Sequence, residues 1–371
     1  MRFIDLNKQQ KLIRSNIDRR IKSVLDQGNY IMGNQISVIE EKLAEYVGVK
    51  YCLSCSSGTD ALLIALMANK IGPGHAVLTS PFTYIATASV ISLLGATPVF
   101  VDIDIKTYNI DPDLIPQAIN SAIDKKLEPK AIIPVDLFGL PADHLKIESV
   151  AKDFGLIVIE DGAQGFGGEI SGKKACSFGD ISATSFFPAK PLGCYGDGGA
   201  LFTNDYKLYN VMKSIRVHGS GSDKYDNVRL GINGRLDEIQ AAILHEKLLI
   251  FPEELISRNL IASYYKENLP DNFHGPEIPD GFVSSWAQFS ILTRSKLSRE
   301  NIMTKLKENN IPSAIYYKRP LHLQKLFHYL SYKENDFPVA EDISKRIFSI
   351  PMHPYLEKTD QDKILTVLNS I

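Results

Sequence analysis

The first fifty residues carry apolar side chains at helical spacing. Between residues 10 and 27 this pattern predicts an amphipathic helix, and its apolar positions are Leu12, Ile13, Ile17, Ile21, Val24 and Leu25. A second helix is predicted at about 35–47. The stretch GNYIMGN, residues 28–34, breaks the pattern with two glycines. In its simplest interpretation it is a turn between the two helices.

Further along, short apolar segments alternate with helical ones. The stretch YCLSCSSGTDALLIALMANK, residues 51–70, reads as a strand, a turn of small residues and a helix that begins at Gly58–Thr59. The same alternation predicts strands at 76–80, 97–104, 131–139 and 156–161, and helices at 83–95 and 144–155. It is typical of a mainly parallel sheet with helices on both faces. In such sheets, ligands collect at the carboxyl ends of the strands.

Beyond residue 180 the pattern changes. Strands are predicted at 181–187 and 200–203, and a long helix at 235–269 with an interruption near Phe251–Pro252. A connector rich in proline and glycine (270–282) precedes a strand at 285–293 and helices at 299–310 and 359–370. We therefore expect an α/β protein with a large domain, 1–250, built on a mainly parallel central sheet. A smaller C-terminal α+β domain would follow at 251–371.

Composition narrows the function classes. The formal net charge of −2 over 371 residues gives no electrostatic case for binding nucleic acid or a membrane surface. No uncharged apolar run is long enough for a membrane span, and the first residues, MRFIDLNKQQ, lack the apolar core of a signal peptide. The expected location is the cytoplasm.

The four cysteines, at positions 52, 55, 176 and 194, are too few for a disulfide scaffold. Cys52 and Cys55 form a C-x-x-C, which could indicate a zinc or redox site. No second pair follows at metal-binding spacing, so we interpret them as small buried side chains and expect no metal site.

The candidate chemistry centres on Lys190. It follows a predicted strand and lies in a run with glycines at 193, 196, 198 and 199. A lysine held in such a turn can attack a carbonyl once burial removes its charge, although most loop lysines are simply solvated. Asp161 ends another predicted strand, and the helix start at Gly58–Thr59 is suited to a phosphate. Pyridoxal phosphate (PLP) needs an amine, an acid facing its pyridine nitrogen, and phosphate donors.

A family resemblance adds to these features. The run SFFPAKPLGCYGDGGALFTND, together with EDGAQ and SSGTDAL before it, resembles the DegT/DnrJ/EryC1/StrS family of PLP-dependent sugar aminotransferases. The resemblance extends from IDLNKQQ near the start to PMHPYL near the end. It implies the type I PLP-dependent aminotransferase fold, with PLP as the cofactor.

The resemblance implies three roles at the reacting centre. Lys190 would form the Schiff base with the cofactor and, once free, carry the proton between the substrate carbon and C4′. Asp161 would keep the pyridine nitrogen protonated; otherwise it is an aspartate that caps the next turn. Gln164 matches the residue that contacts the phenolic oxygen of the ring, and its alternative is a solvated loop amide.

The phosphate and the ring have their own expected contacts. The backbone of Gly58 and the hydroxyl of Thr59 would bind the phosphate. Ser185 would assist, since it precedes Lys190 by the family spacing, although spacing alone does not separate it from Ser182. Tyr84 matches the position that stacks on the pyridine ring; without that match, a tyrosine in an apolar helix is usually core.

Two residues of the segment VRLGINGRLDEIQAA, 228–242, have implied roles. Asn233 matches an asparagine that reaches the cofactor phosphate of the neighbouring subunit, which implies a homodimer with shared active sites. Arg235 matches an arginine that pairs with the carboxylate of a uronic-acid sugar, a task that suits a guanidinium. Alternatively, Arg235 forms a salt bridge with Asp237 or Glu238 at a helix start.

Four further residues are expected near the substrate. The segment IPSAIYYKRPLHLQ, 311–324, resembles the loop that closes over the sugar from the other subunit, so Tyr316 and Tyr317 are candidate sugar contacts. Several relatives carry histidine where this chain has Tyr316, which leaves the detailed contacts open. Tyr30 and Met32 lie in the stretch that is close to the active site in related enzymes.

The implied reaction transfers an amino group from L-glutamate to a nucleotide-linked keto sugar. The motifs most resemble the branch that aminates C3 of UDP-2-acetamido-2-deoxy-3-oxo-glucuronate for lipopolysaccharide O-antigen synthesis. Alternatives are a C4 or dTDP-keto-sugar aminotransferase and a non-catalytic regulatory member with the same fold. Lys190 argues against a sugar dehydratase of this fold, which carries histidine there. A nicotinamide dehydrogenase is disfavoured because no G-x-G-x-x-G follows an early strand.

Overall fold

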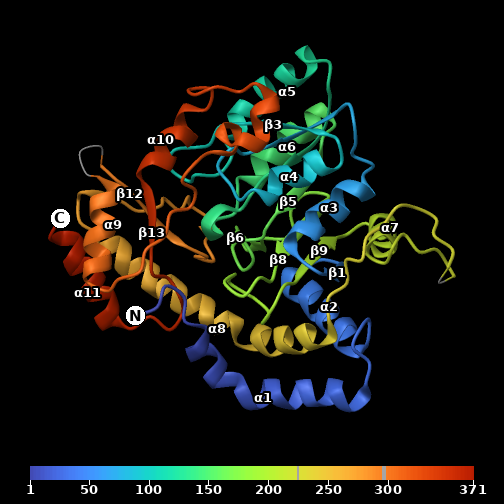
Figure 1. Ribbon diagram of the computed structural model, residues 1–371, viewed down its shortest axis with the longest axis horizontal. Coiled ribbons are helices and arrows are strands. Elements are labelled where there is room, and N and C mark those ends of the chain that lie inside the picture. Colours follow the sequence, from blue (N-terminus) through green and yellow to red (C-terminus); the bar gives the residue numbers. More distant parts are fainter. Residues whose placement is uncertain (224, 295–297) are drawn as a thin grey trace.

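The computed structural model describes residues 1–223, 225–294 and 298–371 (Figure 1). Its centre is a seven-stranded sheet in the order β1-β9-β8-β5-β4-β2-β3. Parallel pairing joins β3, β2, β4, β5 and β8, whereas β9 is antiparallel to both of its neighbours. The strands are β1 (Tyr51–Cys55), β2 (His75–Thr79), β3 (Thr97–Phe100), β4 (Glu128–Ile133), β5 (Ile157–Asp161), β8 (Ile181–Ser185) and β9 (Gly199–Thr203).

Helices cover both faces of this sheet. On one face, apolar residues of α3 (Gly58–Ala68), α4 (Ala86–Leu93) and α7 (Tyr206–Arg216) form one core with the strands. On the other face, one core joins α2 (Asn34–Val47) to α8 (Glu238–Asn268), and a second joins α5 (Ile115–Asp124) to α6 (His144–Phe154). Burial of both faces explains the near-continuous apolar strands and confirms the predicted α/β fold.

The C-terminal part of the chain contains a second, smaller sheet. A small sheet, β10-β12-β13, consists of β10 (Phe273–His274), β12 (Phe289–Thr293) and β13 (Ile347–Ile350). Its core includes residues of α9 (Arg299–Glu308), α11 (Lys358–Asn369) and the far half of α8. The remaining elements are α1 (Leu6–Gln27), α10 (Pro338–Arg346), β6 (Glu169–Ile170), β7 (Lys173–Lys174), β11 (Phe282–Val283), η1 (Pro112–Leu114), η2 (Leu137–Gly139), η3 (Leu321–Leu323) and η4 (Lys325–Leu330).

The predicted interruption near Phe251–Pro252 is wrong, because α8 runs through Pro252 without a break. Phe251, Glu254 and Arg258 are buried on the two sides of the proline, so packing along the helix offsets the lost backbone hydrogen bond. The proposed domain boundary at 250/251 therefore falls inside one continuous helix, and the division into two domains stays a prediction.

Other differences follow from local backbone geometry. The strand predicted at 131–139 ends at Ile133, and residues Leu137–Gly139 form a single 3₁₀ turn in which Phe138 has a left-handed φ of 58°. Strand geometry cannot include such a residue. The first helix begins at Leu6, before the predicted start, because Asp5 accepts a hydrogen bond from Lys8 N.

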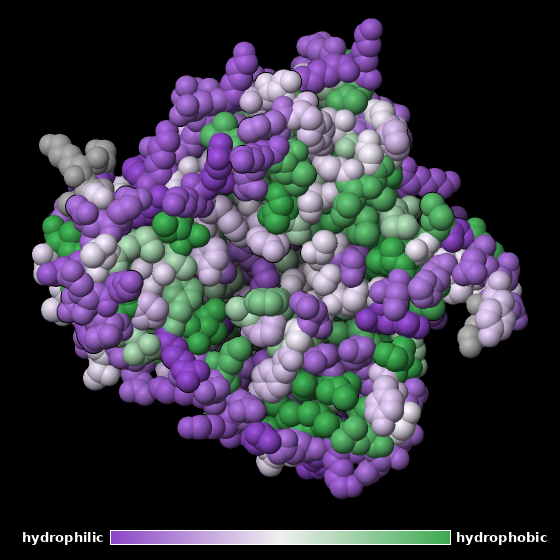
Figure 2. Space-filling model, in the orientation of Figure 1, coloured by the Kyte–Doolittle hydropathy of each residue, from purple (hydrophilic) through white to green (hydrophobic). Residues whose placement is uncertain are grey.

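Two further features concern the apolar residues of the helices. Among the described residues, no helix is long and apolar enough to cross a membrane. Figure 2 shows apolar residues gathered at the lower edge, where α1 and α8 lie in Figure 1. Both helices expose large apolar side chains: Leu12 is 67% exposed and Leu249 is 62% exposed.

Candidate active site

The N-terminus of α3 is pressed against the end of β8. Ser57 caps the helix by accepting a hydrogen bond from Asp60 N at 3.0 Å. A Cβ on Gly58 would lie 2.6 Å from Cβ of Ser185, so only glycine fits this contact. The Ser185 hydroxyl thereby lies at the positive end of α3, together with Thr59 in the first turn. This arrangement is a cradle for a phosphate.

The structure separates Ser185 from Ser182. Ser182 is buried, and its hydroxyl donates to Glu160 Oε2 at 2.6 Å. Ser185 Oγ accepts from Phe187 N at 3.3 Å, which leaves its own proton free to donate. Of these two serines, Ser185 is therefore the one available to an anion at the N-terminus of α3.

Asp161 ends β5 with a buried carboxylate. It accepts hydrogen bonds from Thr87 Oγ1 at 2.8 Å and from Ala163 N at 3.2 Å. Burial raises the pKa of this carboxyl, whereas the two donors and the positive charge of Lys190 oppose the rise. An acid of this kind can hold a protonated ring nitrogen beside it.

Lys190 belongs to the same site as Asp161. Its side chain is partly buried, and its amine makes no hydrogen bond or ion pair with the residues that the structure describes. Burial lowers the pKa of this lysine, and the Asp161 carboxylate partly offsets the shift. A neutral, unpartnered amine is the form that attacks a carbonyl.

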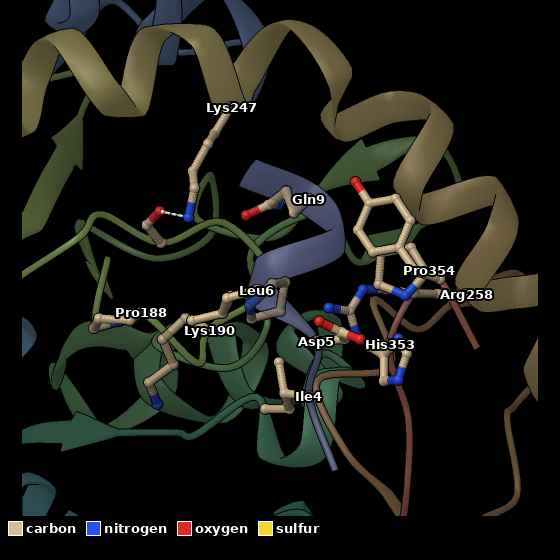
Figure 3. A pocket seen from close by; sticks show the side chains of 13 residues that line it. Ile4, Asp5, Leu6, Gln9, Pro188, Lys190, Lys247, Arg258, His353 and Pro354 are labelled. Carbon is tan, nitrogen blue, oxygen red and sulfur yellow. Dashed lines mark hydrogen bonds between the residues drawn. The ribbon is translucent and has the colours of Figure 1, made fainter. Parts of the chain in front are cut away.

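Helix α8 holds the loop that carries Lys190. Lys247 Nζ donates to Gly193 O at 2.6 Å, and Gln240 Oε1 accepts from Tyr195 N at 2.9 Å. A cavity of about 10 Å³ lies behind this loop, between the N-terminal segment and α8. Figure 3 shows the Lys190 amine directed away from Lys247. Sequence reasoning missed Lys247, because nothing in the helical pattern HEKLL distinguishes it from a solvated lysine.

Gln164 and Tyr317 meet across the edge of the sheet. Gln164 Nε2 donates to the Tyr317 hydroxyl at 3.1 Å, and its Oε1 accepts from Phe138 N at 2.9 Å. Burial raises the pKa of Tyr317, so its hydroxyl stays protonated. Tyr316 is partly buried and packs edge-on against Tyr317. The segment 311–324 is thus placed against the loop that follows Asp161.

Thr87 links Tyr84 to this site. Tyr84 lies just before α4 and is 56% exposed, so its ring is free to contact a ligand. Its carbonyl accepts from Thr87 N at 3.3 Å, and Thr87 is the residue whose hydroxyl binds Asp161. Thr87 was not predicted as a site residue, since a threonine in an apolar helix carries no signal of its own.

Tyr30 and Met32 lie on the exposed loop 28–34 between α1 and α2. They are 49% and 39% exposed, and no hydrogen bond or ring contact among the described residues joins them to Lys190. The backbone carbonyl of Tyr30 accepts from Glu238 N at 3.0 Å. The loop 28–34 is therefore fixed to the start of α8.

Arg235 lacks the salt bridge that its neighbours could have supplied. The Glu238 carboxylate instead accepts from Gly33 N, Gln35 N and Ile36 N at 2.7, 2.8 and 3.1 Å, and so caps α2. Within the described part of the chain Arg235 forms no ion pair, and its buried Nε has no hydrogen-bond partner. Asn233, two residues before, is exposed. Both side chains are available to a ligand or a second subunit.

These features fit PLP on structural grounds. The α3 end and Ser185 suit its phosphate, the Asp161 carboxylate suits its ring nitrogen, and the Lys190 amine suits its aldehyde. The sheet order and the two covered faces define an aminotransferase of fold type I.

The chain belongs to the DegT/DnrJ/EryC1/StrS aminotransferase family, whose model matches residues 11–369. A structure described as a DegT DnrJ EryC1 StrS aminotransferase from Brucella abortus has a TM-score of 0.97 and 48% identity, and covers 100% of this chain and 99% of that one. NtdA from Bacillus subtilis, solved with bound cofactor PMP, has a TM-score of 0.89 and 29% identity over 99% of this chain and 82% of that one. This chain is therefore a PLP-dependent aminotransferase.

Three named relatives are similar over almost the whole chain. UDP-2-acetamido-2-deoxy-3-oxo-D-glucuronate aminotransferase from Pseudomonas aeruginosa is 44% identical and covers 96% of both chains. The "pleiotropic regulatory protein" of Geobacillus stearothermophilus is 40% identical, over 98% of this chain and 96% of that one. UDP-N-acetyl-3-dehydro-alpha-D-glucosamine 3-aminotransferase from Acidithiobacillus ferrooxidans is also 40% identical, over 99% and 96%.

Proposed function

We propose that this chain transfers the amino group of L-glutamate to C3 of UDP-2-acetamido-2-deoxy-3-oxo-glucuronate in the synthesis of a surface polysaccharide such as an O-antigen. The names of two relatives support amination at C3 and a UDP-linked substrate, because each name specifies a UDP sugar oxidised at C3. They differ at C6, where a glucuronate carries a carboxylate and a glucosamine a neutral hydroxymethyl group. We further propose that the reaction takes place in the cytoplasm.

Arg235 is the observation that carries the choice of a uronate. No carboxylate among the described residues pairs with its guanidinium, and Glu238 is already occupied as the cap of α2. A partly buried guanidinium without an acceptor favours a ligand that brings a carboxylate. The C6 carboxylate of the sugar is that group in our proposal.

The reacting centre has two proposed residues. When bound, PLP supplies the electron sink that stabilises negative charge on the substrate carbon. Lys190 would hold the cofactor and move a proton to and from the substrate carbon through Nζ, for which its lowered pKa suits it. Asp161 would hold the proton on the ring nitrogen, while Thr87 fixes the orientation of its carboxylate.

The remaining cofactor contacts follow from the same geometry. Gly58, Thr59 and Ser185 would bind the phosphate at the end of α3. Gln164 would face the phenolic oxygen, and Tyr84 would stack on the ring.

The proposal includes a homodimer with shared sites. The exposed Asn233 would reach the cofactor phosphate of the second subunit. Tyr316 and Tyr317 would instead contact the sugar in the site of their own chain, because Tyr317 is hydrogen-bonded to Gln164 there. Tyr30 and Met32 are exposed beside the start of α8 and would line the same entrance. The exposed apolar residues of α1 and α8 support an interface between copies of the chain.

Two rivals remain from different classes. A C4 or dTDP-keto-sugar aminotransferase would use the same cofactor site. A regulatory role is suggested by the name of the Geobacillus relative, but a purely regulatory protein has no need of an unpartnered amine beside a buried aspartate. Loss of the visible cofactor band on addition of glutamate would identify a catalyst.

The position of amination is tested by product analysis. The protein, converted to its amino form with glutamate, is incubated separately with UDP-3-keto and dTDP-4-keto sugars, and the aminated carbon is identified by NMR. We expect product only from the UDP-3-keto sugar, with the amine at C3. Turnover of 4-keto sugars alone would contradict the proposal.

The choice of uronate is tested by Arg235→Ala. A charged hydrogen bond contributes about 2–3 kcal/mol, so kcat/KM for the uronate should fall on the order of 30- to 150-fold, mainly through KM. The kcat/KM for the neutral 3-keto glucosamine should fall little. Lys152→Ala, at an exposed position of α6, is the control and should change neither value. Equal losses on both sugars would remove the proposed partner of Arg235.

A further inference from the structure

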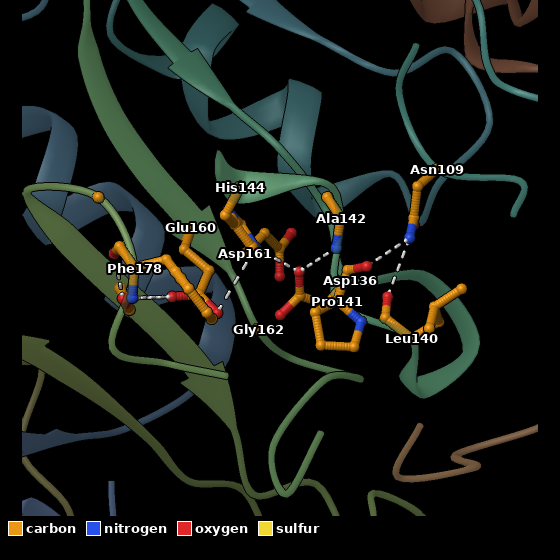
Figure 4. A network of polar contacts seen from close by, with 12 residues as sticks. Asn109, Asp136, Leu140, Pro141, Ala142, His144, Glu160, Asp161, Gly162 and Phe178 are labelled. Carbon is orange, nitrogen blue, oxygen red and sulfur yellow. Dashed lines mark hydrogen bonds and ion pairs between the residues drawn. The ribbon is translucent and has the colours of Figure 1, made fainter. Parts of the chain in front are cut away.

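Three fully buried ionisable side chains lie directly behind Asp161. They are Asp136, His144 and Glu160, each 0% exposed (Figure 4). Glu160 precedes Asp161 on β5, so the two side chains point to opposite faces of the sheet. Backbone bonds tie the strand ends together: Asp136 N donates to Asp161 O at 3.0 Å, and Asp161 N donates to Pro134 O at 2.8 Å.

His144 is a neutral donor in this cluster. Its Nε2 lies 2.7 Å from Asp136 Oδ1 and 3.8 Å from Glu160 Oε1. Its ring stacks on Phe178, with centroids 4.7 Å apart and an interplanar angle of 6°. Burial lowers the pKa of the imidazole, so the Nε2 proton is the single one that His144 donates.

Glu160 has the contacts of an ionised carboxylate. It accepts from Cys176 N at 2.5 Å, from Phe178 N at 2.9 Å and from Ser182 Oγ at 2.6 Å. These donors tie the end of β5 to the loop 176–178 and to β8. The two backbone donors favour the charged form over the neutral one, and the Ser182 hydroxyl, which also lies 2.8 Å from Phe178 O, lies within hydrogen-bond distance of Oε2.

Asp136 lacks the donors that a second buried carboxylate would need. Oδ1 accepts from Ala142 N at 2.9 Å and from His144, while the buried Oδ2 receives no hydrogen bond from the described residues. Carboxyl oxygens of Asp136 and Glu160 lie within 4.8 Å of each other, and each carboxyl shifts the pKa of the other. A proton on Asp136, donated to Glu160, would satisfy both groups.

The surrounding charges agree with one shared proton. Burial raises the pKa of both carboxyls. The charge of Asp136 raises the pKa of Glu160 further, and the charge of Asp161 raises that of Asp136, so the two carboxyls disfavour being ionised together. The Cys176 thiol, also buried, has a raised pKa and contributes no charge. Charged groups also act on His144: Glu160, Glu148 and Asp143 raise its pKa, whereas Lys173 lowers it.

The same residue types could ligate a metal, but the contacts favour hydrogen bonding. The 2.7 Å between His144 Nε2 and Asp136 Oδ1 is a hydrogen-bond length, and the lone pairs of Glu160 already accept three donors. A cation would have to displace these bonds in a cluster closed to solvent.

We propose that Asp136, His144 and Glu160 are positioning residues for Asp161. Asp136 and Glu160 share one proton at neutral pH, and the bonded cluster fixes the end of β5 from the face opposite the cofactor. Asp161 is then the carboxylate that keeps its charge for the ring nitrogen. The inference rests on the proposed role of Asp161, but it is independent of which sugar is aminated.

Asp136→Asn is the decisive variant. An asparagine amide can donate to Glu160 while its oxygen accepts from Ala142 N and His144, so it reproduces the protonated aspartate. Glu160→Gln cannot preserve the hydrogen bonds of Glu160, because a single amide oxygen would have to accept from all the donors that the two carboxylate oxygens now share. We expect kcat of Asp136→Asn within about twofold of wild type, and losses of about 10- to 100-fold in Asp136→Ala and Glu160→Gln. A loss in Asp136→Asn as large as in Asp136→Ala would overturn the shared proton.

Two spectroscopic readouts need no sugar substrate. Infrared spectra of the holoenzyme at neutral pH should show the C=O band of a buried protonated carboxyl, absent in Asp136→Asn and retained in Asp161→Asn. A band lost only in Asp161→Asn, or a metal bound at one equivalent, would contradict the proposal. The pH titration of the visible cofactor band should shift in Asp136→Ala in the same direction as in Asp161→Asn and stay unchanged in Asp136→Asn. An unshifted titration in Asp136→Ala would refute positioning.

Discussion

Lys247 offers a direct test of how α8 supports the lysine loop. Its side chain is 1% exposed, and its Nζ donates to Gly193 O and lies 4.3 Å from the centroid of the Tyr195 ring. No carboxylate among the described residues forms an ion pair with it. Burial lowers the pKa of Lys247 to about 8, although Cys194 and Glu254 oppose the shift.

The lowered pKa makes stability depend on pH in a definite direction. An unfolded lysine titrates at about 10.4, so between about pH 8 and pH 10.4 the unfolded chain binds a proton that the folded chain does not. Stability from this group therefore rises with pH across that window and is lost as pH falls through it. At about 1.4 kcal/mol per unit of pKa, the full effect is about 3 kcal/mol.

Lys247→Met removes the titrating group and keeps most of the side-chain volume. Urea unfolding of both proteins, at fixed protein and PLP concentrations, gives the difference in free energy of unfolding at each pH. From about pH 7.5 to about pH 10 this difference should move in favour of the wild type by about 2 kcal/mol. Lys305→Met, with an exposed side chain on α9, is the control and should show no such trend.

A difference that stays constant across the window would refute the reasoning, because Lys247 would then titrate alike in both states. The variant also leaves Gly193 O without its donor, which loosens the loop that carries Lys190. We expect a lower kcat in Lys247→Met with little change in KM for glutamate.

Two further predictions concern the cofactor site. Gly58→Ala places a Cβ 2.6 Å from Ser185 Cβ, and it should weaken PLP binding about 10- to 100-fold in equilibrium dialysis. Gly72→Ala is the control, because its Cβ would meet nothing closer than 3.8 Å, and it should bind PLP like the wild type. Equal affinities of the two variants would argue against a phosphate at α3. Mixing inactive Lys190→Ala with Asn233→Ala and allowing subunits to exchange should restore about a quarter of wild-type activity, since half of the dimers are mixed and each has one intact site. No recovery would exclude shared sites.

The sequence predicted the sheet well because both of its faces are buried. Strands β2 and β5 each have an apolar run, 76–78 and 157–159, and the polar residues that follow the run mark the strand end. Helix α7 was not predicted, because its mixture of polar and apolar residues resembled a loop. The continuity of α8 was missed for a different reason, since packing around Pro252 overrides the local preference of proline to end a helix.

Within the candidate site, the sequence predicted the residues at strand ends but not the residues that hold them in place through hydrogen bonds. Asp161 and Lys190 are recognisable because motif and strand end coincide. Glu238 reads as a helix-start acid and an obvious partner for Arg235, yet its carboxylate caps α2, more than two hundred residues earlier in the chain. Such long-range hydrogen bonds have no local signature.

The register of β5 and β8 explains why Ser185, and not Ser182, lies at the cofactor site, a choice that sequence spacing left open. Glu160 pairs with Ser182, and Asp161 pairs with Ala183, across the parallel ladder of β5 and β8. Side chains alternate between faces, so Ser185 shares the face of Asp161, and Ser182 shares that of Glu160. One strand pair therefore presents the cofactor residues on one side and the buried proton-sharing cluster on the other. A register shift of one residue would exchange the two sets, which is why hydrogen bonds behind the strand matter to the site in front of it.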